Sequence, residues 1–207
     1  MPSPLGHALG GLAVAWIADL VPGSRAGRAA APQDSFYRRA GGALTVLCAG
    51  LGAAPDLDLV LPSHRTGTHS VTAVLTVTIV AAAVTGWVTR EVRSEKVEGR
   101  RTARVALMCG AAYASHLLLD WLGVDRFPPR GLQILWPVSQ EWFISGLDWF
   151  VQTRRFDLLS LETLRINLYA MAWETTVLLP LLLLLWLVRV KALARFASEL
   201  TRGDHPS

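Results

Sequence analysis

Five apolar stretches separated by polar linkers dominate the chain and decide what it can fold into. They cover residues 4–21, 41–54, 70–89, 103–122 and 166–190. About 20 apolar residues in a helix match the roughly 30 Å hydrocarbon core of a bilayer. With 52% hydrophobic and 17% charged residues, the chain is too apolar for an ordinary soluble domain. We therefore predict an all-α, polytopic membrane helical bundle of about five transmembrane helices, folded as one domain over residues 1–207.

The basic residues indicate how these helices are oriented. If the N-terminus is outside, the inner segments 21–41, 90–104 and 189–207 carry 14 of the 20 Lys and Arg residues, and the outer segments carry six. Because cytoplasmic loops are enriched in Lys and Arg, this predicts a multi-pass protein with the N-terminus out and the C-terminus in. The same distribution explains the net charge of +4, so we expect no nucleic-acid partner.

Residues that can bind a metal gather on one predicted side of the membrane. In the N-out orientation, the outer ends of four apolar stretches carry imidazoles and carboxylates. Ionisable residues in membrane segments are costly and usually functional, so their convergence predicts a metal site. The candidate ligands are His7, Asp56, Asp58, His64, His69, His116 and Asp120.

The spacing within two of these runs supports a shared site. His116 and Asp120 are four residues apart on a predicted helix, so their side chains lie on one face. They can share an ion, or Asp120 can orient His116. His64 and His69 are joined by a turn that contains Gly67, which brings the two imidazoles near one another.

The other two runs are less specific by themselves. Asp56 and Asp58 follow a proline, where a helix must end or bend, and two carboxylates so placed can reach one cation or bridge two. His7 follows Ser3-Pro4, a helix-start signal. A lone histidine on an apolar helix is more often a packed core residue. The other runs at the same membrane face favour a ligand here.

The mixed nitrogen and oxygen ligand set indicates which metal to expect. It suits Zn, Mn, Fe or Ni better than Mg or Ca, which prefer oxygen alone. Seven ligands exceed one tetrahedral zinc site, so either two ions bind or some residues orient the ligands. We predict a divalent transition metal, Zn or Mn, as one or two ions. Arg65, in the same turn as His64 and His69, either holds an anionic substrate group or anchors lipid headgroups.

Three further features lie outside this predicted site. Asp19 follows His7 by twelve residues, about 18 Å along a helix, which predicts a position at the inner face. Glu174 is a second-tier candidate within the last apolar stretch. The aromatic residues between Trp121 and Arg165 predict a short helix lying in the membrane interface, where it could cover the site.

On its motifs the chain resembles the membrane-bound metal-dependent hydrolases of the YdjM/YbcI type, a LexA-regulated, inner-membrane hydrolase-like family. The H-R-x-x-T-H-S block is the most specific of the matches. Thr66-Gly67 replaces the usual glycine and apolar residue, and a Thr-Pro after the last Asp is missing; both changes affect a loop rather than ligands. The matching blocks are Gly6-His7, Pro55-Asp56-Leu57-Asp58, His64-Arg65-x-x-Thr68-His69-Ser70, Ser115-His116-x-x-x-Asp120 and Leu135-Trp136-Pro137.

The resemblance implies a hydrolase of the bacterial inner membrane, and the residues suggest how it would work. We expect hydrolysis by metal-activated water at the outer face, on an amphiphilic ester or phosphoester such as a lipid. Asp58 or Asp120 would accept the proton, and Arg65 would steady the anionic centre. Two alternatives remain open: a metal or proton transporter, which needs polar residues through to the inner face, and a non-catalytic protein whose metal only joins helices.

Overall fold

The described residues are entirely helical and irregular in structure. The structure is a computed structural model that describes residues 1–21, 40–60, 65–89 and 95–203. No β-strand occurs among them, so the predicted all-α class is confirmed. The α-helices are α1 (Pro4–Leu20), α3 (Ala43–Ala53), α4 (Val71–Thr89), α5 (Glu95–Leu122) and α6 (Leu161–Gly203), with 3₁₀ helices η1 (Ala54–Val60) and η2 (Gly67–His69).

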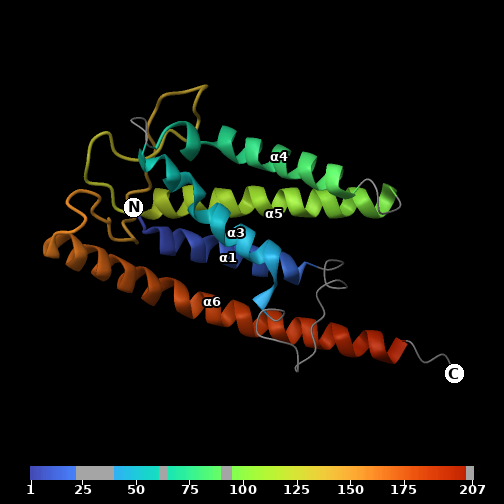
Figure 1. Ribbon diagram of the computed structural model, residues 1–207. Coiled ribbons are helices and arrows are strands. Elements are labelled where there is room, and N and C mark those ends of the chain that lie inside the picture. Colours follow the sequence, from blue (N-terminus) through green and yellow to red (C-terminus); the bar gives the residue numbers. More distant parts are fainter. Residues whose placement is uncertain (22–39, 61–64, 90–94, 204–207) are drawn as a thin grey trace.

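The long helices lie side by side, and one short helix crosses them. In Figure 1, α4, α5, α1 and α6 follow one another across the molecule, and α3 packs against α1 and α5. A buried apolar cluster joins α1, α3 and α5 through Ala15, Cys48, Met108 and Ala112. The N-terminus and the irregular connection 123–160 lie at the same end of this bundle (Figure 1). This end carries the candidate site.

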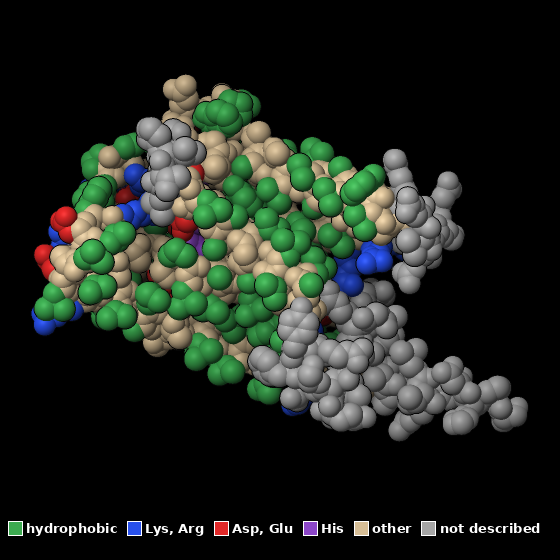
Figure 2. All heavy atoms as spheres, viewed as in Figure 1, with side chains coloured by type: hydrophobic (Ala, Val, Ile, Leu, Met, Phe, Trp, Pro, Cys, Tyr) green, Lys and Arg blue, Asp and Glu red, His purple; other side chains and the backbone are tan. Residues whose placement is uncertain are grey.

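Three of the described helices are long and apolar enough to cross a membrane. The candidate spans are Val71–Thr89, Gly99–Leu122 and Leu161–Arg195. Helix α1 has 17 residues, about 25 Å, and α3 has 11 residues, about 16 Å. Apolar side chains cover the middle of the bundle, and charged side chains gather towards its ends (Figure 2). The total of about five passes and the orientation of the termini stay predictions.

The predicted interfacial helix between Trp121 and Arg165 is wrong. Helix α5 continues to Leu122, α6 begins at Leu161, and the residues between them form turns and extended segments. Three prolines in this connection remove backbone donors and oppose a helix. Leu132 and Phe143 instead exchange backbone hydrogen bonds of 3.0 and 2.9 Å, and Leu132 is buried. The aromatic composition therefore belongs to a folded loop.

Two helices begin at a side-chain cap, and the start predicted at Ser3-Pro4 is confirmed. The Ser3 hydroxyl accepts a hydrogen bond from the Gly6 amide at 3.3 Å, and Pro4 occupies the first helical turn of α1. The Ser70 hydroxyl accepts from the Ala73 amide at 3.2 Å and so caps α4. Both caps lie next to a candidate ligand, His7 or His69, and fix where the following helix begins.

Two glycines allow α1 and α3 to touch through their backbones. A Cβ atom on Gly11 would lie 2.1 Å from the Cys48 carbonyl oxygen, and one on Gly52 would lie 2.4 Å from the His7 carbonyl oxygen. Small residues of this kind let membrane helices approach closely. The contact sets the end of α3, and with it Asp56, beside the first turns of α1.

Candidate metal centre

Six of the seven predicted ligands come together at the end of the bundle where α1 begins and α5 ends. Helix α1 supplies one histidine, η1 two aspartates, η2 one histidine, and α5 a histidine and an aspartate one turn apart. All six are buried, with exposed fractions of 7% or less. The seventh, His64, lies outside the described residues. The six are His7, Asp56, Asp58, His69, His116 and Asp120.

Asp120 is the carboxylate that contacts all three imidazoles. Its Oδ1 is 3.3 Å from His7 Nε2, and its Oδ2 is 3.2 Å from His116 Nε2 and 3.6 Å from His69 Nε2. Asp56 approaches from η1, with Oδ2 3.8 Å from His7 Nε2 and Oδ1 3.9 Å from His116 Nε2. The His7 and His116 rings stack with centroids 3.6 Å apart.

The outward contacts of two histidines fix which ring nitrogen faces the centre. His116 Nδ1 is 2.8 Å from the Gly52 carbonyl oxygen, which can only accept, so Nδ1 carries the proton. His69 Nδ1 is 3.3 Å from Asp58 Oδ2. Ligating histidines commonly donate their second N–H to a carbonyl or carboxylate in this way. The Nε2 lone pairs of His69 and His116 consequently face each other at 3.0 Å.

Several buried atoms at the centre lack a hydrogen bond from any described residue. They are His7 Nδ1 and Nε2, Asp56 Oδ1, and both carboxylate oxygens of Asp120. Buried polar atoms are nearly always satisfied, so this group indicates a missing binding partner. Facing lone pairs next to two carboxylates repel unless a proton or a cation lies among them. The residues present therefore fit a cation.

The donor atoms also have the mutual spacing of a coordination shell. Two triads, His7–His116–Asp120 and Asp56–His69–His116, each have ligand atoms within 4.8 Å of one another. Tetrahedral zinc with nitrogen and oxygen ligands separates neighbouring donors by about 3.3 Å. The observed separations of 3.0 to 3.9 Å bracket that value. His116 belongs to both triads, so it lies at the middle of the group.

Asp58 occupies a different position from the other two aspartates. Its Oδ2 accepts from the Thr68 hydroxyl and from the Arg65 amide at 3.4 Å, and contacts the outer nitrogen of His69. It therefore orients His69 from behind. Burial lowers the pKa of His69, which favours the neutral imidazole that a metal requires.

The predicted anion-binding residue Arg65 is held at the edge of the site by an acidic residue that the sequence analysis did not single out. Its guanidinium pairs with Asp125 and lies 5.8 Å from the Trp142 ring centre. Asp125 also accepts from the Gly131 amide at 2.8 Å and the Gln152 amide nitrogen at 3.2 Å. Asp125 thus ties Arg65 to the 123–160 connection, and no sequence motif marked it.

Arg155 is the second residue that the sequence analysis missed. Its guanidinium nitrogen Nη2 is 3.9 Å from Asp56 Oδ1, and its side chain is 28% exposed. It comes from the irregular chain before α6, so only the tertiary fold brings it to the centre. This partly exposed cation lies directly beside a candidate ligand.

The Leu135-Trp136-Pro137 block lies against the loop that carries His69. The Val71 amide donates to the Ile134 carbonyl at 2.8 Å, and the Thr72 hydroxyl donates to the Trp136 carbonyl at 2.7 Å. These bonds attach the 123–160 connection to the start of α4. The block supports the site without supplying a ligand.

Two other buried acids lie apart from the centre. Glu174 accepts from the Ser3 amide at 2.7 Å and the Ser3 hydroxyl at 2.5 Å, so it fastens the start of α1 to α6. Asp19 lies at the far end of α1, as expected, and binds Arg104 and Arg189 at 2.9 Å each. Neither acid contributes to the candidate metal centre.

Comparison with known families agrees with the resemblance seen in the motifs. Residues 1–196 match the sequence profile of the YdjM inner membrane protein family. Searches among curated proteins and among solved structures gave no significant match. The family match covers every residue of the candidate centre.

Proposed function

The chain belongs to the YdjM inner membrane protein family, and on that premise we propose that it is a metal-dependent hydrolase. Its substrate is an amphiphilic ester or phosphoester at the outer membrane face. The observation that carries the proposal is the buried convergence of three imidazoles and two carboxylates. Within it, both ring nitrogens of His7, Asp56 Oδ1 and both Asp120 oxygens lack hydrogen bonds from described residues. Such a donor set suits a divalent transition metal, Zn or Mn.

The residues divide into ligands and supports. Nε2 of His7, His69 and His116 and the carboxylates of Asp56 and Asp120 would hold the ion or ions. A divalent metal there supplies a Lewis acid that polarises the substrate and acidifies water. Asp58 and the Gly52 carbonyl oxygen orient His69 and His116.

Of the two carboxylates predicted as proton acceptors, Asp120 is better placed than Asp58. Both Asp120 oxygens face the centre and accept no hydrogen bond from a described residue. Asp58 Oδ2 already accepts from Thr68 and Arg65. We therefore propose that one Asp120 oxygen holds the ion and the other accepts the proton.

Arg155 supplies positive charge where an anionic group would bind. Its guanidinium is 3.9 Å from Asp56 Oδ1 and its side chain is 28% exposed, against 14% for Arg65, which pairs with Asp125. A guanidinium matches phosphate or carboxylate in geometry and charge. We assign substrate anchoring to Arg155 and keep Arg65, the residue predicted from the sequence, as a supporting residue at the edge of the site.

A non-catalytic centre that only joins helices is the second candidate. The ligands come from α1, η1, η2 and α5, so a bound ion would connect four elements. A transporter is less well supported. A transit path would need polar groups between the centre and Asp19, whereas the buried cluster that joins α1, α3 and α5 is apolar and consists of Ala15, Cys48, Met108 and Ala112.

The first experiment is metal content of the detergent-purified protein by elemental analysis. We expect about one or two Zn or Mn ions per chain, lost in His69→Ala and His116→Ala. Ser115→Ala is the matched control, because among the described residues its hydroxyl donates to the Ala112 carbonyl of its own helix and not to a candidate ligand. No metal in the wild type after reconstitution with Zn or Mn would reject the proposal.

Turnover then separates the two candidates. Lipids with carboxyl-ester or phosphoester bonds are incubated with the metal-loaded protein, and products are identified by mass spectrometry. A hydrolase releases product that disappears in Asp120→Asn and falls strongly in Arg155→Gln. Stoichiometric metal without product from either lipid class supports the helix-joining role.

A further inference from the structure

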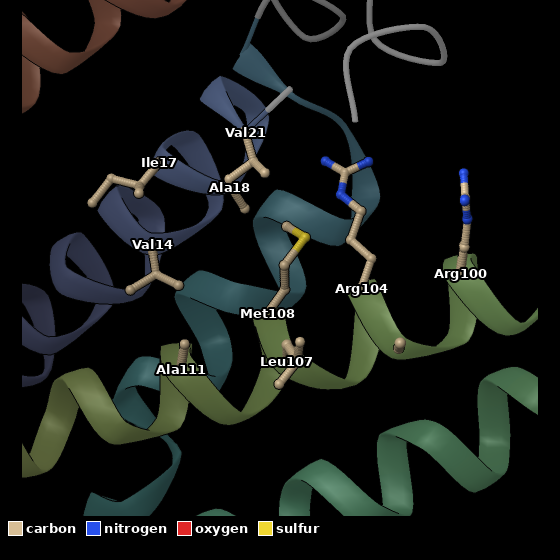
Figure 3. Close-up of a pocket in the computed structure, with 10 residues that line it drawn as sticks. Val14, Ile17, Ala18, Val21, Arg100, Arg104, Leu107, Met108 and Ala111 are labelled. Carbon is tan, nitrogen blue, oxygen red and sulfur yellow. The ribbon is translucent and has the colours of Figure 1, made fainter. Parts of the chain in front are cut away.

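A second feature of α1 and α5 lies towards the opposite end of the bundle from the metal centre. A groove of about 630 Å³ runs between them, within the size range of small-ligand sites. Figure 3 shows Val14, Ile17 and Val21 on one wall and Leu107 and Ala111 on the other. Ile17, Val21 and Leu107 are each more than half exposed. The groove is therefore open and apolar.

Two arginines stand at one end of this groove. Arg100 and Arg104 are four residues apart on α5, so both project from the face that carries Leu107 and Ala111 (Figure 3). Arg104 Nη2 is 2.9 Å from Asp19 Oδ1, and the Arg104 side chain is 28% exposed. Arg100 is exposed and makes no hydrogen bond or ion pair to another described residue. The apolar groove thus ends at two positively charged side chains.

We propose that this groove binds one anionic phospholipid, with the phosphate on Arg100 and Arg104 and an acyl chain along the apolar walls. The argument is complementarity: the walls suit a hydrocarbon chain, and the arginines suit a phosphate. Basic pockets between transmembrane helices select anionic headgroups in this way. In the predicted orientation this end also faces the cytoplasmic leaflet.

This lipid is separate from any substrate of the metal centre. Arg104 precedes His116 by twelve residues on α5, a rise of about 18 Å. The headgroup would therefore lie far from the imidazoles and carboxylates. The inference does not depend on hydrolysis or on a bound metal.

The test is native mass spectrometry of the full-length, detergent-purified protein titrated with dioleoyl phosphatidylglycerol or dioleoyl phosphatidylcholine. We expect one tightly bound phosphatidylglycerol and weaker phosphatidylcholine. Arg100→Gln should weaken phosphatidylglycerol about fivefold. Arg101→Gln is the matched control, because this exposed neighbour points about 100° away around α5 and does not line the groove.

A second variant tests the apolar part. Ala103 lines the groove from an exposed position, so Ala103→Phe fills it without entering the core. Phosphatidylglycerol should then lose its tight site, and phosphatidylcholine should bind more weakly still. Equal affinity for the two lipids, or equal losses in Arg100→Gln and Arg101→Gln, would overturn the proposal. An unchanged elution volume in size-exclusion chromatography and an unchanged thermal unfolding midpoint in detergent confirm that the bundle remains folded in all three variants.

Discussion

The two ends of the bundle bury charged groups on the same two helices in opposite ways. At one end, each carboxylate oxygen of Asp19 accepts from an arginine at 2.9 Å, from Arg104 and from Arg189. At the other, Asp120 Oδ1 and Oδ2 face three imidazoles and accept no hydrogen bond from a described residue. In the first cluster both carboxylate oxygens are paired with the chain's own arginines. In the second, both oxygens lack a hydrogen-bond donor among the described residues, and we propose that a cation binds there.

The difference separates a structural cluster from a binding site. Buried ion pairs hold elements in register but add little stability beyond what apolar packing would give. Buried atoms left without partners are tolerated where a ligand satisfies them. Excess acceptors, rather than burial or charge alone, therefore distinguish the end of the bundle where we propose that a metal binds.

The largest expected effect on stability comes from breaking the cluster of Asp19 with Arg104 and Arg189. Asp19→Asn removes the negative charge that neutralises Arg189, whose side chain is 1% exposed. We expect a loss of about 3–5 kcal/mol in the free energy of unfolding, measured by thermal unfolding in detergent. Metal content per folded chain should not change. A loss of metal without a loss of stability would reverse our assignment of the two ends.

Metal removal should affect only the candidate metal centre around Asp120. A chelator should destabilise the wild type by about 3 kcal/mol if the ion was present at roughly 100 times its dissociation constant. Differential scanning fluorimetry with and without chelator measures the shift. Asp120→Asn should lose the chelator effect, and Arg104→Gln should keep it. A chelator shift that persists in Asp120→Asn would place the ion elsewhere.

Within the metal end, Asp58→Asn tests whether Asp58 is a ligand or a support. Because Asp58 contacts the outer nitrogen of His69, we expect full metal stoichiometry with about 10- to 100-fold weaker affinity. Competition with a fluorescent chelator gives both quantities. A stoichiometry reduced to the level of Asp120→Asn would make Asp58 a direct ligand.

Sequence reasoning predicted those features of the two ends of the bundle that follow from helix periodicity and from signals at helix ends. The one-turn spacing of His116 and Asp120, the cap at Ser3 and the distance of Asp19 from His7 are properties of single helices. The structure accordingly brings six of the seven predicted ligands together, while their role as metal ligands remains a prediction.

The residues that sequence reasoning missed depend on tertiary contacts instead. Arg155 and Asp125 lie in the irregular 123–160 connection, whose path is set by long-range backbone bonds such as Val124 to Phe150 at 2.9 Å. The position of Asp58 behind His69 depends on how η1 meets η2. The helix in this connection was predicted from its aromatic composition. Aromatic content alone does not take into account the prolines, which oppose a helix.

The smallest expected effect comes from an ion pair that resembles the Asp19 pairs in distance but not in burial. Arg154 Nη1 is 2.7 Å from Glu162 Oε1, with side chains 33% and 72% exposed. Water screens such a pair, so Glu162→Gln should change the free energy of unfolding by less than about 1 kcal/mol. The same thermal unfolding assay that reads Asp19→Asn measures it. A loss as large as that of Asp19→Asn would mean that burial does not decide how much an ion pair contributes to the stability of this protein. The contrast between the two ends would then rest only on the Asp120 carboxylate oxygens, which lack hydrogen bonds from described residues.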